Sequence, residues 1–127
     1  MSKVTIFLAN GFEEIEALTV VDLCRRAGIE ITMAAVTKGI CAGEDVCVTG
    51  SHGISVKADI ILSEVDFDSM DMLVLPGGMP GTINLGKHSG LEKLLREFDK
   101  QEKYIAAICA APSVFGQYGF LKGKKAT

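Results

Sequence analysis

The side chain with the most obvious chemical potential is the thiol of Cys109. It follows the apolar segment 105–108 and is itself followed by Ala110, Ala111 and Pro112. Proline is well tolerated in the first turn of a helix, so the pattern predicts a strand that ends here and a helix that starts at once. Small neighbours suit the sharp, strained turn of a nucleophile elbow. We therefore expect Cys109 at the carboxyl edge of a sheet, where open α/β folds place their sites.

This position has a consequence for the ionisation of the thiol. The N-terminus of a helix has partial positive charge, which favours a thiolate over a thiol. We expect the pKa of Cys109 to be lowered and the thiolate to attack a carbonyl carbon. The alternative is that Cys109 is a buried small hydrophobic residue, the usual fate of an isolated cysteine. Its context favours the functional interpretation, whereas Cys24, Cys41 and Cys47 fit the structural one.

An acid/base partner for the thiol is suggested by Glu13, Glu14 and Glu16, which open a predicted helix over 13–27. Acidic residues in a first helical turn stabilise the helix dipole and need no further role. Glu16 lies next to apolar helix positions and can point toward the sheet edge. A carboxyl group buried beside a thiolate would stay protonated and donate a hydrogen bond to the sulfur. We hypothesise that Glu16 is the partner of Cys109, although the sequence leaves their proximity open.

A third candidate feature is the glycine pair Gly77-Gly78, which follows the apolar segment 72–75 and Pro76. It is either a simple turn or a place where backbone N–H groups approach a substrate oxygen. Together with the N–H of Ala110, the second interpretation predicts an oxyanion site.

The elements that must position these residues alternate between strands and helices. Buried strands are predicted by four apolar runs, at 4–9, 29–36, 72–75 and 104–108. Helical patterns separate them, at 13–27, 90–101 and 111–118, with Ile15, Leu18, Val21 and Cys24 expected on the inner face of the first. Segment 45–57 is predicted to form a small β-hairpin. The order indicates one α/β domain over 1–127, a doubly wound, mostly parallel sheet with helices on both faces.

Composition excludes several classes of function. Thirteen basic and 16 acidic residues leave a formal net charge of −3, with no basic stripe of the kind that binds nucleic acid. No apolar segment approaches the length of a signal sequence core or a membrane span, so we expect a cytoplasmic protein. In that reducing compartment the four cysteines are expected to be free thiols. No Cys/His spacing typical of a metal site is present, and no metal is expected.

Four motifs occur in the order of one family: residues 11–16 (GFEEIE), 21–28 (VDLCRRAG), 75–78 (LPGG) and 105–112 (IAAICAAP). The chain resembles over its whole length the ThiJ/PfpI superfamily, and within it the branch of bacterial YajL and the parkinsonism-associated protein deglycase. The resemblance implies a flavodoxin-like fold and a homodimer to which the first helix contributes, without metal or organic cofactor. It also implies that Cys109 is the family's oxidisable nucleophile and that Glu16 is the glutamate hydrogen-bonded to it. Gly77, Gly78 and Ala110 would supply the backbone donors.

The chain departs from the family in two places. Peptidase and amidotransferase-like relatives have a histidine directly after the cysteine, where this chain has Ala110, which argues against those activities. Family chains also continue well past Thr127, with a further pocket residue, often a histidine or an aromatic. Residues 123–125 read as a turn and 126–127 as the start of a strand. We therefore expect the C-terminal part of the domain to be missing, with a separate fragment of the same protein as a possible partner.

The resemblance implies a cofactor-independent, cysteine-dependent enzyme that acts on small carbonyl substrates, α-oxoaldehydes or their adducts, as a glyoxalase or deglycase. In this scheme Cys109 attacks the aldehyde and Glu16 moves a proton between adjacent carbons. The alternative is a redox-sensing stress-response protein or chaperone in which Cys109 is oxidised. A role in thiamine-related metabolism rests only on the historical family name.

Overall fold

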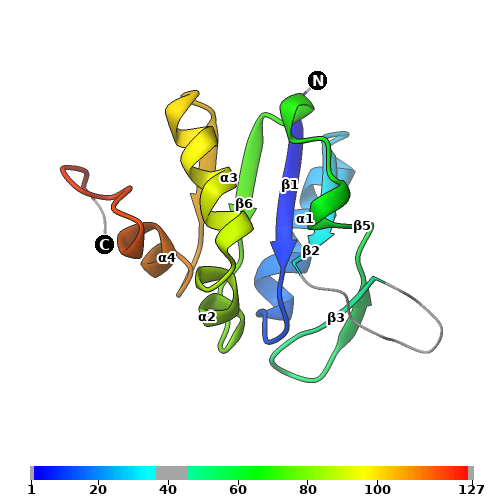
Figure 1. Ribbon diagram of the computed structural model, residues 1–127. Helices are drawn as coiled ribbons and strands as arrows, with labels where there is room; N and C mark the ends of the chain where they lie inside the picture. Colours follow the sequence, from blue (N-terminus) through cyan, green and yellow to red (C-terminus); the bar gives the residue numbers. More distant parts are fainter. Residues whose placement is uncertain (1, 37–45, 126–127) are drawn as a thin grey trace.

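A parallel sheet forms the centre of the molecule (Figure 1). The computed structural model describes residues 2–36 and 46–125. Within them the sheet has five strands in the order β5-β2-β1-β6-β7, and every neighbouring pair is parallel. The strands are β1 (Lys3–Leu8), β2 (Glu30–Ala35), β5 (Ile60–Ile61), β6 (Met72–Leu75) and β7 (Tyr104–Ala107). The predicted mostly parallel α/β fold is confirmed.

Helices cover both faces of this sheet, as predicted. They are α1 (Glu14–Arg26), α2 (Gly81–Gly86), α3 (Ser89–Lys100) and α4 (Pro112–Gln117). Helix α1 packs on one face, and α2, α3 and α4 pack on the other (Figure 1). The first helix ends where it was expected, because Gly28 adopts a φ of 77°, a left-handed conformation that few residues other than glycine adopt easily.

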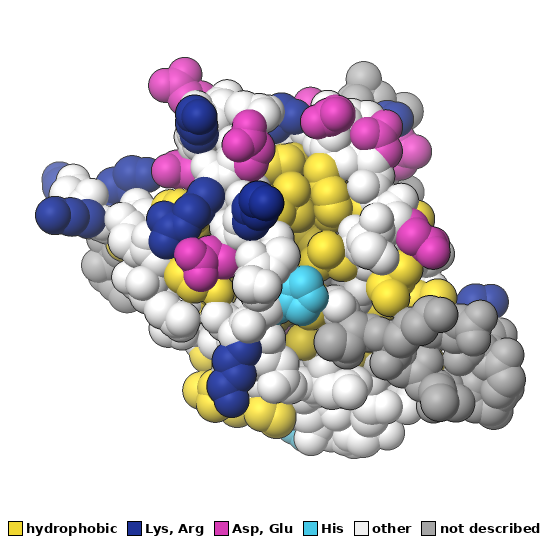
Figure 2. Space-filling view, viewed as in Figure 1, with side chains coloured by type: hydrophobic (Ala, Val, Ile, Leu, Met, Phe, Trp, Pro, Cys, Tyr) yellow, Lys and Arg dark blue, Asp and Glu magenta, His cyan; other side chains and the backbone are white. Residues whose placement is uncertain are grey.

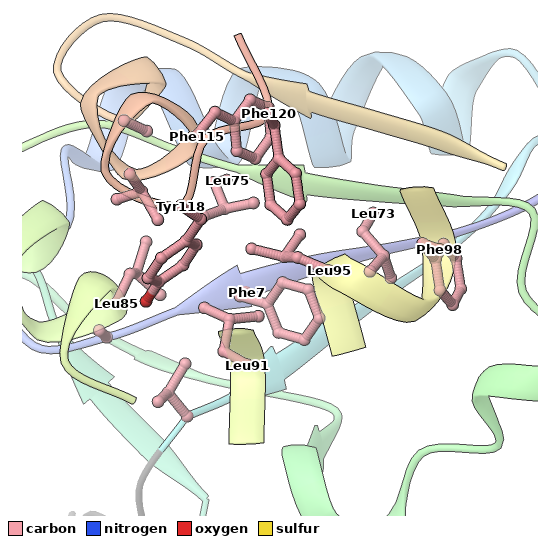
Figure 3. Packing of buried hydrophobic residues seen from close by; sticks show 14 of the residues in the cluster. Phe7, Leu73, Leu75, Leu85, Leu91, Leu95, Phe98, Phe115, Tyr118 and Phe120 are labelled. Atoms are coloured by element: carbon pink, nitrogen blue, oxygen red, sulfur yellow. The ribbon is translucent and has the colours of Figure 1, made fainter. Parts of the chain in front are cut away.

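Two hydrophobic cores hold the layers together, one on each face of the sheet. On the α3 side, buried side chains from the strands and the three helices interdigitate (Figure 3), among them Phe7, Leu75, Leu91, Leu95 and Phe115. On the α1 side, Ala17 and Val21 pack against β1 and β2. The central position of β1 follows from its apolar run, since its residues contribute to both cores.

The inner face of α1 agrees with the prediction at Val21, Leu18 and Cys24, which pack against the core, but not at Ile15. Ile15 is 75% exposed, and the buried residues are Glu14, Ala17 and Val21. Leu18 and Cys24 are half-buried. In the first turn, Glu14 is buried in place of Ile15 because its carboxylate is bound by the hairpin turn that covers it. An apolar side chain at that position would have left those donors unpaired.

The predicted hairpin is present as β3 (Cys47–Thr49) and β4 (Ser55–Lys57), which pair antiparallel. Some short elements were not predicted, because they have too few residues to show a period: β5, α2 and the 3-10 turns at Leu62–Glu64 and Phe67–Ser69.

The expectation that all the cysteines are free thiols is wrong for Cys47, which lies in the hairpin. Cys24 and Cys109 are free, but Cys47 is disulfide-bonded. The prediction from a reducing compartment failed because it does not consider which sulfur atoms the fold brings together. Cys41 lies outside the described residues.

Acidic and basic side chains are both found on the face covered by α2, α3 and α4 (Figure 2). On the opposite face of the sheet, an open apolar groove of about 880 Å³ runs beside α1, lined in part by Val20, Met72, Val74 and Tyr104. None of the helices in the described part of the chain is long and apolar enough to cross a membrane.

Candidate active site

Cys109 occupies a strained turn between β7 and α4. Its φ is 60°, a left-handed value that is uncommon for a residue other than glycine. The turn is fixed on either side, because the Ile108 N–H donates to the Leu75 carbonyl and the Ala111 N–H donates to the Ile108 carbonyl. The Cys109 side chain is exposed. The predicted sharp turn is therefore confirmed, and the alternative of a buried structural cysteine is not what the fold shows.

Glu16 reaches the same place from α1. Its Oε1 atom accepts a hydrogen bond from the Gly77 N–H at 3.0 Å, and its side chain is half-buried. A Cβ atom added to Gly77 would lie 2.6 Å from Glu16 Oε1 and 2.8 Å from the Cβ of Cys109. Only glycine leaves room for this approach. The fold thus brings together Glu16 from the first turn of α1, Gly77 from the loop after β6 and Cys109 from the turn after β7, at the carboxyl edge of the sheet.

The thiol and the carboxylate interact directly, and this overturns the expected ionisation. The pKa of Cys109 is raised above its ordinary value, because the thiol hydrogen-bonds to Glu16 and the negative charge of Glu16 opposes a thiolate. Desolvation acts in the same direction, and the Ala110 N–H acts against it. The predicted lowering of the Cys109 pKa is wrong. Cys109 lies before Pro112, where α4 begins, and the effect of the Glu16 carboxylate on the thiol pKa outweighs that of the Ala110 N–H.

Two of the three predicted backbone donors, the N–H groups of Gly77 and Ala110, already donate hydrogen bonds within the protein. The Gly77 N–H binds Glu16, and the Ala110 N–H binds the sulfur of Cys109. Gly78 adopts a φ of 96°, and a Cβ there would lie 2.3 Å from the Glu13 nitrogen, so this residue lets the two loops pack. The glycine pair therefore orients the carboxylate and fits against the start of α1.

From the sequence, Glu14 was expected only to stabilise the helix dipole, yet it is the buried carboxylate of the region, 4% exposed. It accepts hydrogen bonds from the backbone N–H of His52 at 2.8 Å and of Ile54 at 3.3 Å, and it lies 3.0 Å from His52 Nδ1. Burial acts to raise its pKa, but the hydrogen bonds from His52 and from backbone N–H groups outweigh it and lower the pKa to about 2. The sequence contained one signal for the burial of Glu14, its spacing from Ala17 and Val21, which places the three residues on one helix face.

His52 completes this cluster from the tip of the hairpin. Its pKa is raised because its ring hydrogen-bonds to Glu14 and because the charges of Glu13 and Glu14 favour the imidazolium. Within the described residues, Glu13, Glu14 and His52 form the one group whose ligand atoms could jointly reach a metal ion. Both Glu14 oxygens already accept hydrogen bonds, so an ion would have to displace those donors.

Comparison with known proteins shows to which family the chain belongs. The sequence model of the DJ-1/PfpI family matches residues 2–127. The chain belongs to this family. Among DJ-1/PfpI relatives, Protein DJ-1 homolog B of Arabidopsis thaliana is 41% identical over 98% of the chain, which covers 27% of that protein. Deglycase PfpI of Pyrococcus furiosus is 34% identical over 98% of the chain, which covers 70% of that protein.

The same relationship appears in three dimensions. The structure of oxidised DJ-1 from Toxoplasma gondii superimposes with a TM-score of 0.89 at 40% identity, over the full chain. This chain spans 66% of that DJ-1 family structure and about a quarter of the Arabidopsis relative. The predicted membership of the ThiJ/PfpI superfamily is confirmed.

Proposed function

We propose that the protein is a cofactor-independent enzyme that uses Cys109 to convert α-oxoaldehydes, or their adducts with amines and thiols, into hydroxy acids. The observation that supports it most is the contact between the exposed Cys109 thiol and the Glu16 carboxylate. A thiol with a raised pKa needs a base in contact with it to become a nucleophile at neutral pH. Relatives named deglycases, such as the one from Pyrococcus furiosus, agree with this reaction class.

The geometry suggests the following steps for methylglyoxal. Glu16 takes the thiol proton while the sulfur bonds to the aldehyde carbon, then gives the proton to the aldehyde oxygen, which yields a hemithioacetal. The carboxylate next removes the hydrogen of that carbon as a proton and returns it to the neighbouring carbon, while the hydroxyl proton of the hemithioacetal passes to the neighbouring oxygen. The first carbon is thereby oxidised to a thioester and its neighbour reduced to an alcohol. Water hydrolyses the thioester, releases the hydroxy acid and restores the thiol.

The backbone donors complete this proposal. The N–H groups of Gly77 and Ala110 hold Glu16 and the sulfur in the resting site. Gly78 is then the proposed donor to the substrate oxygen, and the Ala110 N–H would turn to it as the sulfur forms its new bond.

Steady-state loss of methylglyoxal tests the proposal. Cys109→Ala should abolish the activity, and Glu16→Gln should lower kcat by a factor on the order of 10² or more, the usual range for loss of a general base. Cys24→Ala is the matched control, since Cys24 is also a free thiol but lies half-buried on α1. Undiminished turnover by Cys109→Ala would remove the proposal.

A second candidate function is redox sensing, favoured by the exposure of the Cys109 thiol next to a hydrogen-bonding carboxyl group. Two equivalents of hydrogen peroxide would convert the thiol to a sulfinic acid with release of two waters. Mass spectrometry after mild peroxide treatment should find the added oxygen on Cys109 and little on Cys24. Equal oxidation of the two would count against a dedicated sensor.

We also propose that the protein forms a homodimer through the outer face of α1. Apolar side chains are exposed on this face and on the adjoining hairpin: Ile15 is 75%, Leu23 59% and Ile54 53% exposed. Leu18 lies between them and lines the same shallow depression. Sedimentation equilibrium should show a dimer that Leu23→Lys dissociates. A monomer at all concentrations would contradict this part of the proposal.

A further inference from the structure

The β3–β4 hairpin is fastened to the loop that leads into α1, independently of any contact with Cys109. The Gly11 N–H donates to the Thr49 carbonyl at 2.8 Å, and the Ser51 N–H donates to the Phe12 carbonyl at 2.8 Å. The turn between the strands therefore lies directly over the start of the helix.

The buried carboxylate of Glu14 is the centre of this attachment. Ser51 Oγ, the His52 and Ile54 N–H groups and His52 Nδ1 all lie within 3.4 Å of its oxygens. There is no spare room, since a Cβ atom on Gly50 would lie 2.3 Å from the Glu14 carboxyl carbon. Charged hydrogen bonds of this kind are about twice as strong as neutral ones. The Glu14 carboxylate thus joins the hairpin turn to the first turn of α1.

The opposite side of the same helical turn is attached to the loop after β6. The Glu13 N–H donates to the Gly77 carbonyl at 2.9 Å, and Glu16 accepts from the Gly77 N–H. The first turn of α1 is therefore held between two loops, by Glu14 on the hairpin side and by Glu13 and Glu16 on the Cys109 side.

We propose that Glu14 is a positioning residue, whose attachment to the hairpin turn holds Glu16 against the Cys109 thiol. This inference deepens the proposed function and rests on it, because Glu16 is the base of that reaction. If the hairpin attachment is lost, the first turn of α1 has one anchor instead of two, and the hydrogen bond from the thiol to Glu16 weakens.

The alkylation rate of Cys109 with iodoacetamide, measured against pH on the purified protein, tests this without any turnover. The hydrogen bond to Glu16 is the main cause of the raised pKa of the thiol. In Glu14→Gln we expect the midpoint to move toward lower pH by about half a unit to one unit, a roughly three- to tenfold gain in thiolate below the midpoint. Glu92→Gln is the matched control, a half-buried carboxylate on α3 paired with Arg96, and should leave the profile unchanged.

A double-mutant cycle separates positioning from simple charge removal. If Glu14 acts through Glu16, then Glu14→Gln should shift the midpoint in the native background and have no effect in the Glu16→Gln background. Equal shifts in both backgrounds, or a shift that high salt abolishes, would mean a direct charge effect and would overturn the proposal. A loss of stability with an unchanged midpoint would also overturn it, as a purely structural role.

A milder variant keeps the test usable if Glu14→Gln does not fold. His52→Ala removes one contact to Glu14 from a side chain that is 65% exposed, and leaves the backbone N–H donors in place. The same cycle with His52→Ala should give a smaller shift that again vanishes with Glu16→Gln. Turnover by Cys109→Ala would refute the proposed function, whereas an additive cycle would refute only the positioning by Glu14.

Discussion

Gly77→Ala should disturb the site more than any other single added methyl group near Cys109. The new Cβ would lie 2.6 Å from Glu16 Oε1, 2.8 Å from Cys109 Cβ and 3.0 Å from the Ile108 carbonyl oxygen. The first two distances are shorter than real Cβ contacts, so Glu16 must move away or the elbow must shift. Overpacking of this kind usually costs about 1–3 kcal/mol.

Two assays follow the consequences of this substitution. Urea unfolding should show a loss of about 1–3 kcal/mol in the free energy of unfolding. Alkylation against pH should show the Cys109 midpoint at lower pH, since the pKa of that thiol is raised chiefly by its hydrogen bond to Glu16 and displacement of Glu16 weakens it. More of the thiol is then ionised at neutral pH, while turnover falls because the base is misplaced.

Gly116→Ala is the matched control for this prediction. Gly116 lies in α4, and a Cβ there would meet the Leu121 Cδ1 atom at 3.8 Å, an ordinary contact. Alanine in a helix is favoured over glycine by about 1 kcal/mol, so this variant should be as stable as the native protein or more stable. If Gly77→Ala matched it in stability and kept the native alkylation profile, our account of the crowding around Glu16 would be refuted.

Three further predictions follow from the structure. Glu16→Gln should lower the midpoint of Cys109 alkylation, because it removes the charge that opposes the thiolate. The pKa of Glu14 is lowered from 4.5 to about 2, so the contribution of Glu14 to stability is complete above pH 4.5 and is lost as the pH falls toward 2. The pKa of His52 is raised, so the contribution of His52 is complete below pH 6.5 and is lost at higher pH. Urea midpoints at pH 3, 5.5 and 8 should therefore be highest at 5.5, and Glu14→Gln should flatten the profile. Thr5→Val should leave stability unchanged or raise it by about 1 kcal/mol in urea unfolding, because the Thr5 hydroxyl is buried in β1 without a hydrogen-bond partner among the described residues.

Much of the fold was predictable because its signals are local. The apolar runs of β1 and β6 indicate strands buried on both faces, and Gly28 marks the end of α1. The turn at Cys109 was predictable for the same reason, since an apolar strand, small residues and Pro112 are neighbours in the chain. Family membership likewise depends on short motifs in a fixed order.

Some features of the helix and the hairpin could not be predicted in this way. Ile15 and Glu14 are adjacent, and helical periodicity alone suggested the apolar one for the inner face. The donors of the hairpin turn decided otherwise, because a buried carboxylate that receives several hydrogen bonds is stable where an isolated one is not. The disulfide at Cys47 depends in the same way on which sulfur atoms the fold brings together.

The ionisation of the site was also decided by tertiary structure. The sequence alone indicated the elbow and the succession of strands and helices along the chain, both of which depend on neighbouring residues. It did not determine that Glu16 and Gly77, 61 positions apart, share a hydrogen bond next to Cys109, nor that this contact raises the pKa of the thiol. Charge interactions depend on distances in space, and those distances exist only once the loops after β1, β6 and β7 meet at one edge of the sheet.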